Sequence, residues 1–341
     1  MKKSVRLSDI AASLGVSTVT VSKALSGQKG VSETLRSRIV ELADSMGYVP
    51  PSKEPREAKQ NGYTLGVLVG ERYLDKYDSF YLQLYNQLTG RAIARQCFTL
   101  LEPLDITAEK ERRLPKMVEE GRVDGIIVMG RLSFDYLDFL NDNCRMPVIY
   151  LDFCDKKKES DAVISDSYYG AYRLTNYLFG MGHTQIGYVG TVLATGSITD
   201  RYMGYMRSMM EHGCEVKNEW VIEDREKEHG VIDPDKYLVL PDELPTAFVC
   251  NCDLAASYLV RKLTARGLKV PEDISVVGYD NFLYPGLCDV EITTYEVDIK
   301  EMARRAVHTL IKKISGEDYR RRVYIVEGHM VIKDSVRKIN I

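Results

Sequence analysis

The sequence reads VRLSDIAASLGVSTVTVSKALSGQKGVSETLRSRIVELADSMGY from residue 5 to residue 48, and this stretch predicts three short helices in tight succession. Apolar side chains over residues 7–14 recur at the spacing of a helix that buries one face. Ser17 is placed to cap a second helix that runs to about Leu25, because its hydroxyl can accept a backbone N–H. Ser32 stands in the same way before a third helix with its own apolar stripe.

The second of these helices carries small polar and cationic side chains on its outer face. Thr18 and Ser22 can hydrogen-bond to base edges or phosphates, and Val19 can pack on a thymine methyl. Lys23 can reach a guanine acceptor or a phosphate, as a point charge rather than as the fork of an arginine. A helix, a short glycine-containing turn and a second helix with such a face are typical of a helix-turn-helix. The residues expected to contact DNA are Ser17, Thr18, Val19, Thr20, Ser22 and Lys23.

From pattern alone, the alternative is a three-helix module that binds only protein. The stretch GVSTVTVSKALSGQKGVSETLRSRIVELADSMGYVP, residues 15–50, closely resembles the DNA-binding headpiece of the lactose-repressor (LacI/GalR) family of bacterial transcription regulators, which favours DNA binding. The chain keeps the family pattern at Gly15, Val16, Ser17, Thr20, Val21, Ser22, Leu25, Gly27, Val31, Ser32, Arg36, Gly47, Tyr48 and Pro50. It departs from the pattern at Lys23 (usually Arg), Ser26 (usually Asn) and Leu35 (often Thr).

Composition places the chain among ordinary soluble globular proteins. Its 341 residues suggest two or three domains, and the net charge is −3. Residues 1–50 carry seven Lys and Arg against four Asp and Glu, so a mildly basic head precedes an acidic body. No signal peptide or membrane-spanning run is present, so we expect a cytosolic protein. The seven cysteines, an odd number, are expected to be reduced, and Cys250 and Cys252 to be buried thiols rather than metal ligands.

Residues 51–62 are polar and rich in proline, and they are predicted to be a linker. In the family that the headpiece resembles, this linker folds on operator DNA into a hinge helix whose leucine inserts into the minor groove. Glu57 stands where that leucine is expected, and Pro55 lies inside the would-be helix. A carboxylate will not insert between bases that face phosphates, and proline removes a helical N–H. We therefore do not expect this chain to kink DNA in the family's way.

From Tyr63 onwards, short apolar runs alternate with amphipathic helices. The expected strands cover residues 65–69, 125–129, 147–151, 186–189, 247–250 and 274–279. The expected helices cover residues 80–95, 108–120, 168–181, 199–212, 253–267 and 298–315. Continuous apolar strands separated by helices indicate parallel sheets covered on both faces, and the length fits two such α/β lobes.

These patterns give the expected domain organisation. The headpiece spans residues 1–50, the linker 51–62, and an effector-binding and dimerisation domain 63–341. Within that domain we expect a first lobe of about 63–153 and 298–322, and a second lobe of about 154–297 and 323–341.

Polar residues follow several of the expected strands. Ligands of open α/β sheets bind beyond the carboxyl ends of the strands, which directs attention to Asp152, Asn251, Cys252 and Asp280. Carboxylates and amides that converge on a cleft suit a polyhydroxylated ligand such as a sugar. The alternative is that each acidic residue only caps the following helix, and we favour that interpretation for Asp253.

The body also resembles the family's effector domain, which is similar to periplasmic sugar-binding proteins. The matching segments are MGHTQIGYVG, SITDRYMGYM, PEDISVVGYDN and TTYEVD, in the family's order. The resemblance places Arg201 on an effector-contacting arginine, with Ser197 one helical turn before it. It also implies effector contacts from Asp152, Asp280, Phe80 and Tyr81. The alternative for Arg201 is a purely structural ion pair.

Two departures from the family concern the cleft. Cys252 and Asp253 stand where the family has Asn and Asp, with Asn251 one place earlier, so the effector chemistry differs there. Residues 225–247 replace an expected amphipathic helix with a stretch containing Gly230 and three prolines, which cannot form one long helix and is expected to border the cleft. His183 is expected to be structural, and no catalytic triad order, P-loop or dinucleotide motif is present.

The sequence thus predicts a transcription regulator, most simply a repressor, with no cofactor and no metal. It would act as a homodimer on a near-palindromic operator, controlled by a small-molecule effector, a sugar or sugar derivative, bound between two lobes. The alternatives are a soluble sugar-binding protein and a sugar-converting enzyme that uses Asp152 and Asp280 as an acid/base pair. The sequence leaves open which sugar binds, whether it is an inducer or a corepressor, and whether dimers pair into tetramers.

Overall fold

The computed structural model describes residues 7–25, 30–46, 48, 62–74, 80–155, 160–282 and 286–339. The chain divides into two compact units, residues 1–60 and residues 61–341. The expected hinge positions, Pro55 and Glu57, lie outside the described residues. None of the helices in the described ranges is long and apolar enough to cross a membrane.

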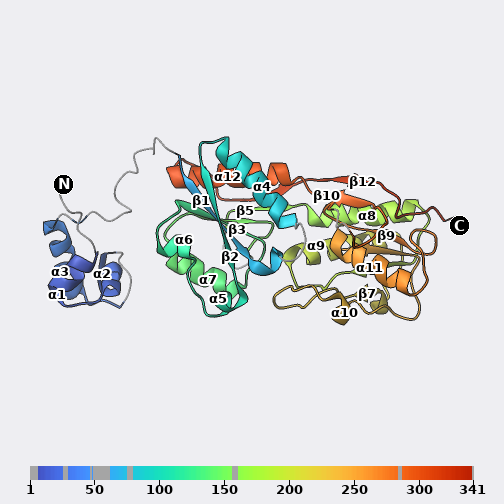
Figure 1. Cartoon of the computed structure of the whole chain (residues 1–341), viewed down its shortest axis with the longest axis horizontal. Helices are drawn as coiled ribbons and strands as arrows, with labels where there is room; N and C mark the ends of the chain where they lie inside the picture. Colours follow the sequence, from blue (N-terminus) through green and yellow to red (C-terminus); the bar gives the residue numbers. More distant parts are fainter. Residues whose placement is uncertain are drawn as a thin grey trace. The chain divides into compact units, whose positions relative to one another are not determined.

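The N-terminal unit contains α1 (Leu7–Leu14), α2 (Thr18–Leu25) and α3 (Glu33–Ser45) (Figure 1). The predicted start signals are confirmed: Ser17 Oγ accepts the Thr20 N–H at 3.1 Å, and Ser32 Oγ accepts the Leu35 N–H at 3.4 Å. The small core of this unit consists of Ile10, Ala11, Val21, Ala24, Ile39 and Ala43. Each helix contributes two of these residues, so the apolar faces of the three helices meet in the centre.

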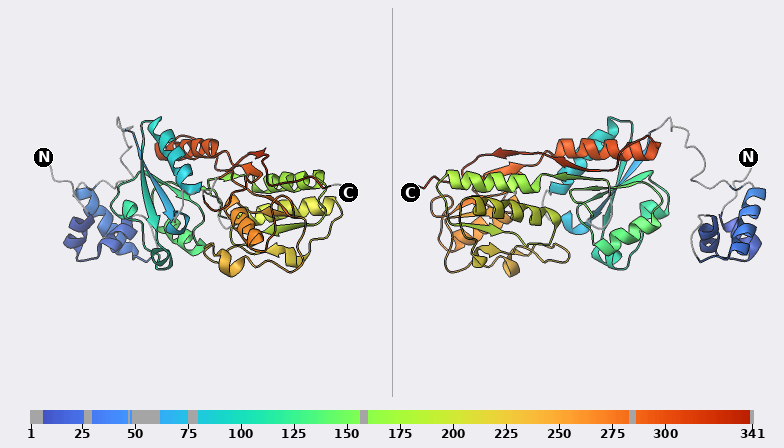
Figure 2. Two further views of the ribbon diagram at one scale, coloured as in Figure 1. Left: turned by 45° about the vertical axis from the view of Figure 1, so that its right-hand side comes forward. Right: turned by 180° about the vertical axis from the view of Figure 1, so that it is seen from behind.

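The first lobe of the body is built on a parallel sheet in the order β11-β5-β4-β3-β1-β2. Its strands are β1 (Thr64–Gly70), β2 (Phe98–Leu104), β3 (Gly125–Met129), β4 (Val148–Leu151), β5 (Ala162–Ser165) and β11 (Val323–Val326). The helices and the 3-10 turn of this lobe are η1 (Glu71–Tyr73), α4 (Phe80–Ile93), α5 (Ile106–Lys110), α6 (Lys116–Glu119), α7 (Phe134–Asn143) and α12 (Ile299–Ser315). Although far apart in sequence, α12 and α4 pack side by side (Figure 2).

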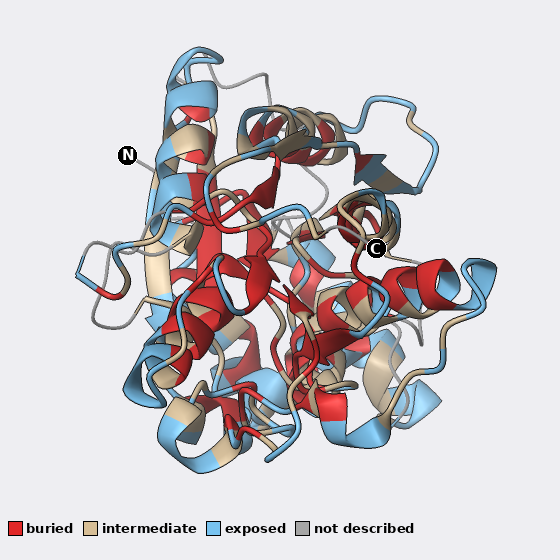
Figure 3. Ribbon diagram, turned by 90° about the vertical axis from the view of Figure 1, so that its right-hand side faces the viewer, coloured by how far each residue is buried: buried red, intermediate tan, exposed pale blue. Residues whose placement is uncertain are grey.

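The second lobe is built on a parallel sheet in the order β7-β6-β8-β9. Its strands are β6 (Ile186–Val189), β7 (Val221–Ile222), β8 (Ala247–Cys250) and β9 (Ser275–Val277), and β10 (Thr294–Glu296) pairs antiparallel with β12 (His329–Val331). The helices are α8 (Ser167–Gly180), α9 (Gly196–Glu211), η2 (Asn218–Trp220), α10 (Pro234–Tyr237) and α11 (Asp253–Ala265). Buried residues concentrate on the strands and on the helix faces turned to them (Figure 3), as expected for sheets covered by helices.

The expected lobe boundaries are wrong. Residues 162–165 and 323–326 belong to the first lobe, because Ala162 of β5 is paired with Tyr150 of β4 and with Val323 of β11. The chain therefore crosses between the lobes after Ser165, after β10 and after β11. The crossings after β10 and after β11 lie close together: a Cβ on Gly328 would meet the Glu296 carbonyl oxygen at 2.0 Å, so only glycine fits there.

Most of the expected strands and helices are present, with one clear error. The single helix expected at 108–120 is divided into α5 and α6. Arg112 between them adopts a left-handed φ of 54°, and Pro115 precedes α6, so no continuous helix is possible.

Candidate functional site

The outer face of α2 presents the side chains expected to contact DNA. Val19 is 61% exposed, and Thr18 and Lys23 are exposed beside it, while Val21 on the opposite side is fully buried. Ser17 and Thr20 are engaged locally, with their hydroxyl oxygens 2.9 Å apart at the start of the helix. Ser22 is half-buried on the flank.

Arg36 on α3 holds the end of α2 in place. Its Nη1 donates to the carbonyl oxygens of Ala24 at 2.9 Å and Lys23 at 3.4 Å. These carbonyls belong to the last turn of α2, so the guanidinium hydrogen-bonds to the C-terminal end of that helix and complements the helix dipole. The family pattern contains this arginine, but only the packing of α3 against α2 shows its role.

A cavity of about 590 Å³ lies between the lobes of the body. All eight residues expected to contact an effector line it: Phe80, Tyr81, Asp152, Ser197, Arg201, Asn251, Cys252 and Asp280. The first three come from the first lobe and the others from the second. The polar members lie at strand ends or on the first turns of α9 because both parallel sheets point their carboxyl ends at the cavity.

Arg201 is buried in the second-lobe wall of this cavity. Its Nη1 donates to the Asn251 carbonyl oxygen at 2.5 Å, and its Nη2 donates to Asp280 Oδ1 at 3.3 Å. Its guanidinium carbon lies 3.7 Å from the centre of the Tyr279 ring. The ion pair considered as the alternative is therefore present, but both of its members also line the cavity.

Two carboxyl groups face the cavity from opposite lobes in an uncommon backbone conformation. Asp152 and Asp280 adopt φ of 69° and 102°, a region that residues other than glycine seldom occupy. Tyr81 donates its hydroxyl to Asp152 Oδ2 at 2.8 Å. Burial raises the pKa of the Asp280 carboxyl to about 7, against the opposing effect of Arg201 and with a further upward effect of Asp152. Such strain tends to be retained where it aims a side chain at a ligand.

Sequence reasoning missed the buried pair of Asp224 and Arg225. Arg225 donates from Nη2 to Asp224 Oδ2 at 2.7 Å and to Asn251 Oδ1 at 3.0 Å. Asn251 in turn donates to Asp224 Oδ2 at 2.7 Å, and the Thr191 N–H reaches Asp224 Oδ1 at 3.0 Å. Arg225 lines the cavity, so this network delivers a fixed guanidinium to it.

The segment that departs from the family does border the cavity. Residues 230–235 line it, and a bridge between Arg225 and Ile232 folds the segment back on itself. Its only helix is α10, as the prolines predicted. These residues therefore form a part of the cavity wall that would have a different shape if the segment were one amphipathic helix.

Cys252 lines the cavity and also takes the capping role that we expected of Asp253. Cys252 is the N-cap of α11, with its Sγ accepting the Ala255 N–H at 3.4 Å, so the cap expected from Asp253 is wrong. Asp253 is the first helical residue, and its carboxylate turns to accept the Phe282 N–H at 2.8 Å. Burial raises the pKa of the Cys252 thiol to about 11, so it stays protonated at neutral pH. His183 is buried between Thr246 Oγ1 at 2.9 Å and the Arg337 carbonyl at 3.1 Å, a structural arrangement.

Among the described residues, Glu226, Glu228 and His229 offer three atoms within 4.8 Å of one another, the spacing of a metal site. The Glu226 carboxylate, however, already accepts the N–H groups of Glu228 at 2.5 Å and His229 at 2.6 Å. Its oxygens shape the turn, and we assign no metal to this cluster.

Comparison with known proteins identifies the family. Residues 6–51 match the model of bacterial regulatory proteins of the lacI family, and residues 175–336 match a periplasmic binding protein-like domain. The HTH-type transcriptional repressor PurR of Vibrio vulnificus is 31% identical over 340 residues, covering 98% of this chain and 99% of that protein. The chain belongs to the LacI family.

Solved structures show the same fold. The lac repressor dimer bound to operator and the anti-inducer ONPF superposes with a TM-score of 0.63 at 20% identity, over 98% of this chain and 100% of that one. The complex of the transcriptional regulator CelR with cellobiose gives 0.66 at 21% identity, over 97% of this chain and 99% of that one. As a LacI-family regulator, the protein is a DNA-binding transcription factor and not the sugar-converting enzyme considered as an alternative.

Proposed function

We propose that this LacI-family regulator is a cytosolic homodimeric repressor whose DNA affinity is controlled by a neutral sugar in the 590 Å³ cavity. The relative from Vibrio vulnificus carries the name of a repressor, and the lac repressor structure is a dimer on operator DNA. Two headpieces then read two half-sites about one helical turn apart. The effector changes repression only as far as it binds the two lobe arrangements with different affinity.

The pairing of charges in the cavity carries the choice of a neutral ligand. Arg72 is bound to Glu109 at 2.6 Å, just as Arg201 and Arg225 are bound to Asp280 and Asp224. Each of these three guanidinium groups thus has its counter-charge, and the fourth arginine that lines the cavity, Arg261, is exposed to solvent. A phosphate or carboxylate would therefore meet no buried, uncompensated cation. The three ion pairs place fixed hydrogen-bond donors beside fixed acceptors, and the hydroxyl groups of a sugar can bind to both.

Aromatic side chains form the first-lobe wall. The Tyr73 and Tyr81 rings are 4.6 Å apart, and the Phe80 and Tyr81 rings 5.4 Å apart. Sugar rings present apolar C–H faces as well as hydroxyls, so an aromatic wall opposite a polar wall matches both sides of such a ligand. The CelR complex shows that the same fold holds cellobiose in one relative.

The test begins with capture of genomic fragments by the purified protein, followed by sequencing. We expect one near-palindromic sequence to be enriched. Neutral sugars and sugar phosphates are then added to the complex with that fragment, and binding is followed by fluorescence anisotropy. A neutral sugar that changes DNA affinity supports the proposal. An effect confined to phosphorylated or carboxylated ligands would contradict it.

Replacing Lys23 by Ala should weaken binding to the captured fragment about tenfold and reduce the slope of log affinity against log salt by about 1 if Lys23 binds a phosphate. Arg38→Ala, which removes an exposed cation from α3, is the matched control and should change neither quantity. An unchanged slope with lost discrimination between operator variants would place Lys23 on a base edge instead. An unchanged affinity would remove it from the interface.

Affinity for the sugar should rise with pH through about 7. Below that value Asp280 is protonated and accepts hydroxyl protons poorly, and above it the carboxylate accepts them well. Between pH 6 and pH 8 we expect a gain of up to about tenfold in calorimetric titrations, because the ionised fraction changes by that factor. Asp280→Asn should flatten the profile.

The pKa of Asp280 in the folded protein lies above that of an aspartate in the unfolded chain. The contribution of this group to the free energy of unfolding should therefore be lost as pH rises from about 4 to 7.

A further inference from the structure

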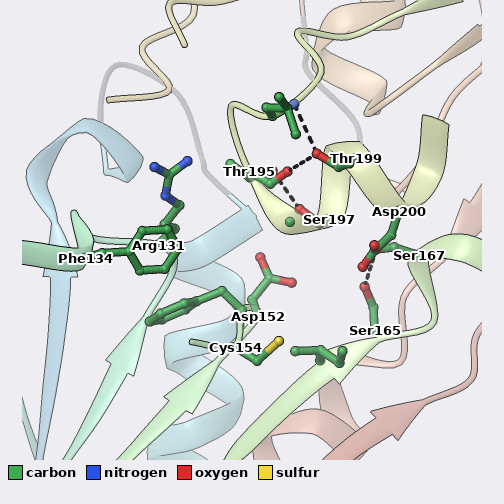
Figure 4. Close-up of a pocket in the computed structure, with 14 residues that line it drawn as sticks. Arg131, Phe134, Asp152, Cys154, Ser165, Ser167, Thr195, Ser197, Thr199 and Asp200 are labelled. Atoms are coloured by element: carbon green, nitrogen blue, oxygen red, sulfur yellow. Dashed lines mark hydrogen bonds between the residues drawn. The ribbon is translucent and has the colours of Figure 1, made fainter. Parts of the chain in front are cut away.

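A second, smaller cavity of about 210 Å³ adjoins the effector cavity (Figure 4). The two cavities share Asp152, Thr195 and Ser197 in their walls. The smaller volume corresponds to that of about seven liquid water molecules, which is enough for one sugar ring. No sequence motif indicated it, because its walls come from both lobes and from the crossing after β5.

Hydroxyl groups line the second-lobe side and the crossing. Ser165 and Ser167 are both buried, with their Oγ atoms 3.3 Å apart, and the Thr195 and Ser197 hydroxyls are 3.0 Å apart. In each pair one hydroxyl proton is used in the hydrogen bond between the two side chains. The other hydroxyl proton and several oxygen lone pairs can therefore bind a ligand. Figure 4 shows the Ser197, Ser165 and Asp152 side chains around the same space. Buried hydroxyls of this kind are suited to exchange hydrogen bonds with a polyol.

Apolar surface completes the lining. Phe134 and Phe153 belong to the first-lobe wall, and Leu193 closes the second-lobe side in a strained conformation with φ of 72°. The Arg131 guanidinium lies 5.3 Å from the centre of the Phe134 ring and donates across the lobes to the Ala194 carbonyl oxygen. Asp152 is already bound to Tyr81. Arg131 and Asp152 are thus engaged within the protein, and beside the Asp200 carboxylate the cavity offers a ligand mainly hydroxyls and apolar faces.

Building on the proposed function, we propose that the effector is a neutral disaccharide with one ring in each cavity. The shared residues Thr195 and Ser197 then lie beside the glycosidic link, where hydroxyl side chains from the start of α9 can hydrogen-bond to either ring. A monosaccharide would occupy the larger cavity and leave the smaller one to water. A lobe arrangement that encloses both rings makes more contacts with a disaccharide than with a monosaccharide, so the disaccharide has the greater differential affinity for it.

The probes are cellobiose, maltose, lactose and xylobiose, each paired with its constituent monosaccharides. Isothermal titration of the full-length protein should show at least one disaccharide binding ten times more tightly than its own monosaccharides. Monosaccharides that bind as tightly as the disaccharides would overturn the two-ring inference and leave the neutral-sugar proposal standing. Binding of none of these sugars, with responses only to charged ligands, would refute both.

Gly196→Phe provides a test within the chain. Gly196 lines only the smaller cavity, and a Cβ added there meets no atom within 4 Å, so the new ring can fill the space without strain. Disaccharide affinity should fall at least tenfold, while the affinity for the constituent monosaccharide stays within twofold. Gly180→Phe on α8 also places its Cβ in open space, away from both cavities, and should change neither affinity. Equal losses for mono- and disaccharide in Gly196→Phe, or no loss for either, would overturn the proposal.

Discussion

Arg201→Ala should lower effector affinity about 100-fold or more and leave DNA binding without effector unchanged. Arg201 is the guanidinium that joins the Asn251 carbonyl, Asp280 and the cavity, and removing a buried charged donor costs a ligand about 2–5 kcal/mol. The headpiece does not depend on this side chain for its own core. The readouts are calorimetric titration with the sugar and anisotropy with the captured DNA fragment.

Two further variants separate a binding role from a structural one. Arg207 lies on the same helix in an exposed ion pair with Glu211, so the Arg207→Ala variant should behave like the wild type. Arg201→Lys keeps the charge next to Asp280 but loses the planar stacking on Tyr279, so we expect an intermediate loss of about tenfold. An Arg201→Ala protein that is folded, as judged by its melting temperature, and still responds to effector like the wild type would show that the ion pair is only structural.

Asp224→Ala should lower the free energy of unfolding of the body by about 3–5 kcal/mol, because it leaves the buried Arg225 guanidinium without its counter-charge. Burial opposes ionisation, yet Arg225 and Asn251 hold the pKa of Asp224 below its usual value. Its contribution is therefore present above the pKa of the unfolded chain and is lost as pH falls below about 4. Urea denaturation at neutral pH measures the difference.

Glu223→Ala is the matched control, since Glu223 is the exposed neighbour of Asp224 on the same strand end. Surface changes of this kind usually alter stability by less than about 0.5 kcal/mol. A loss in Asp224→Ala no larger than that of Glu223→Ala would show that Arg225 finds another partner. Effector affinity should fall together with stability in Asp224→Ala, because the same contacts aim Arg225 at the cavity.

The sequence alone predicted the headpiece because its signals are local. Ser17 and Ser32 cap helices whose apolar residues recur every three or four positions, and such signals act within one helical turn. The apolar runs of β3, β6 and β8 were predicted to the residue for the related reason that fully buried strands are continuously apolar. The residues at strand ends were predicted to share a cleft because parallel strands end at the same edge.

Other features required the tertiary structure, since they depend on residues far apart in the chain. The strands β5 and β11 are only four residues long, and their pairing across about 160 residues assigns them to the first lobe. Arg36 acts on α2 through packing, and Arg225 is held in the cavity wall by Asn251, 26 residues away, as well as by its neighbour Asp224. The smaller cavity is the space left where two lobes and a crossing segment meet. Sequence periodicity reports which side of an element is buried, whereas the shape of a cavity depends on how separate elements pack.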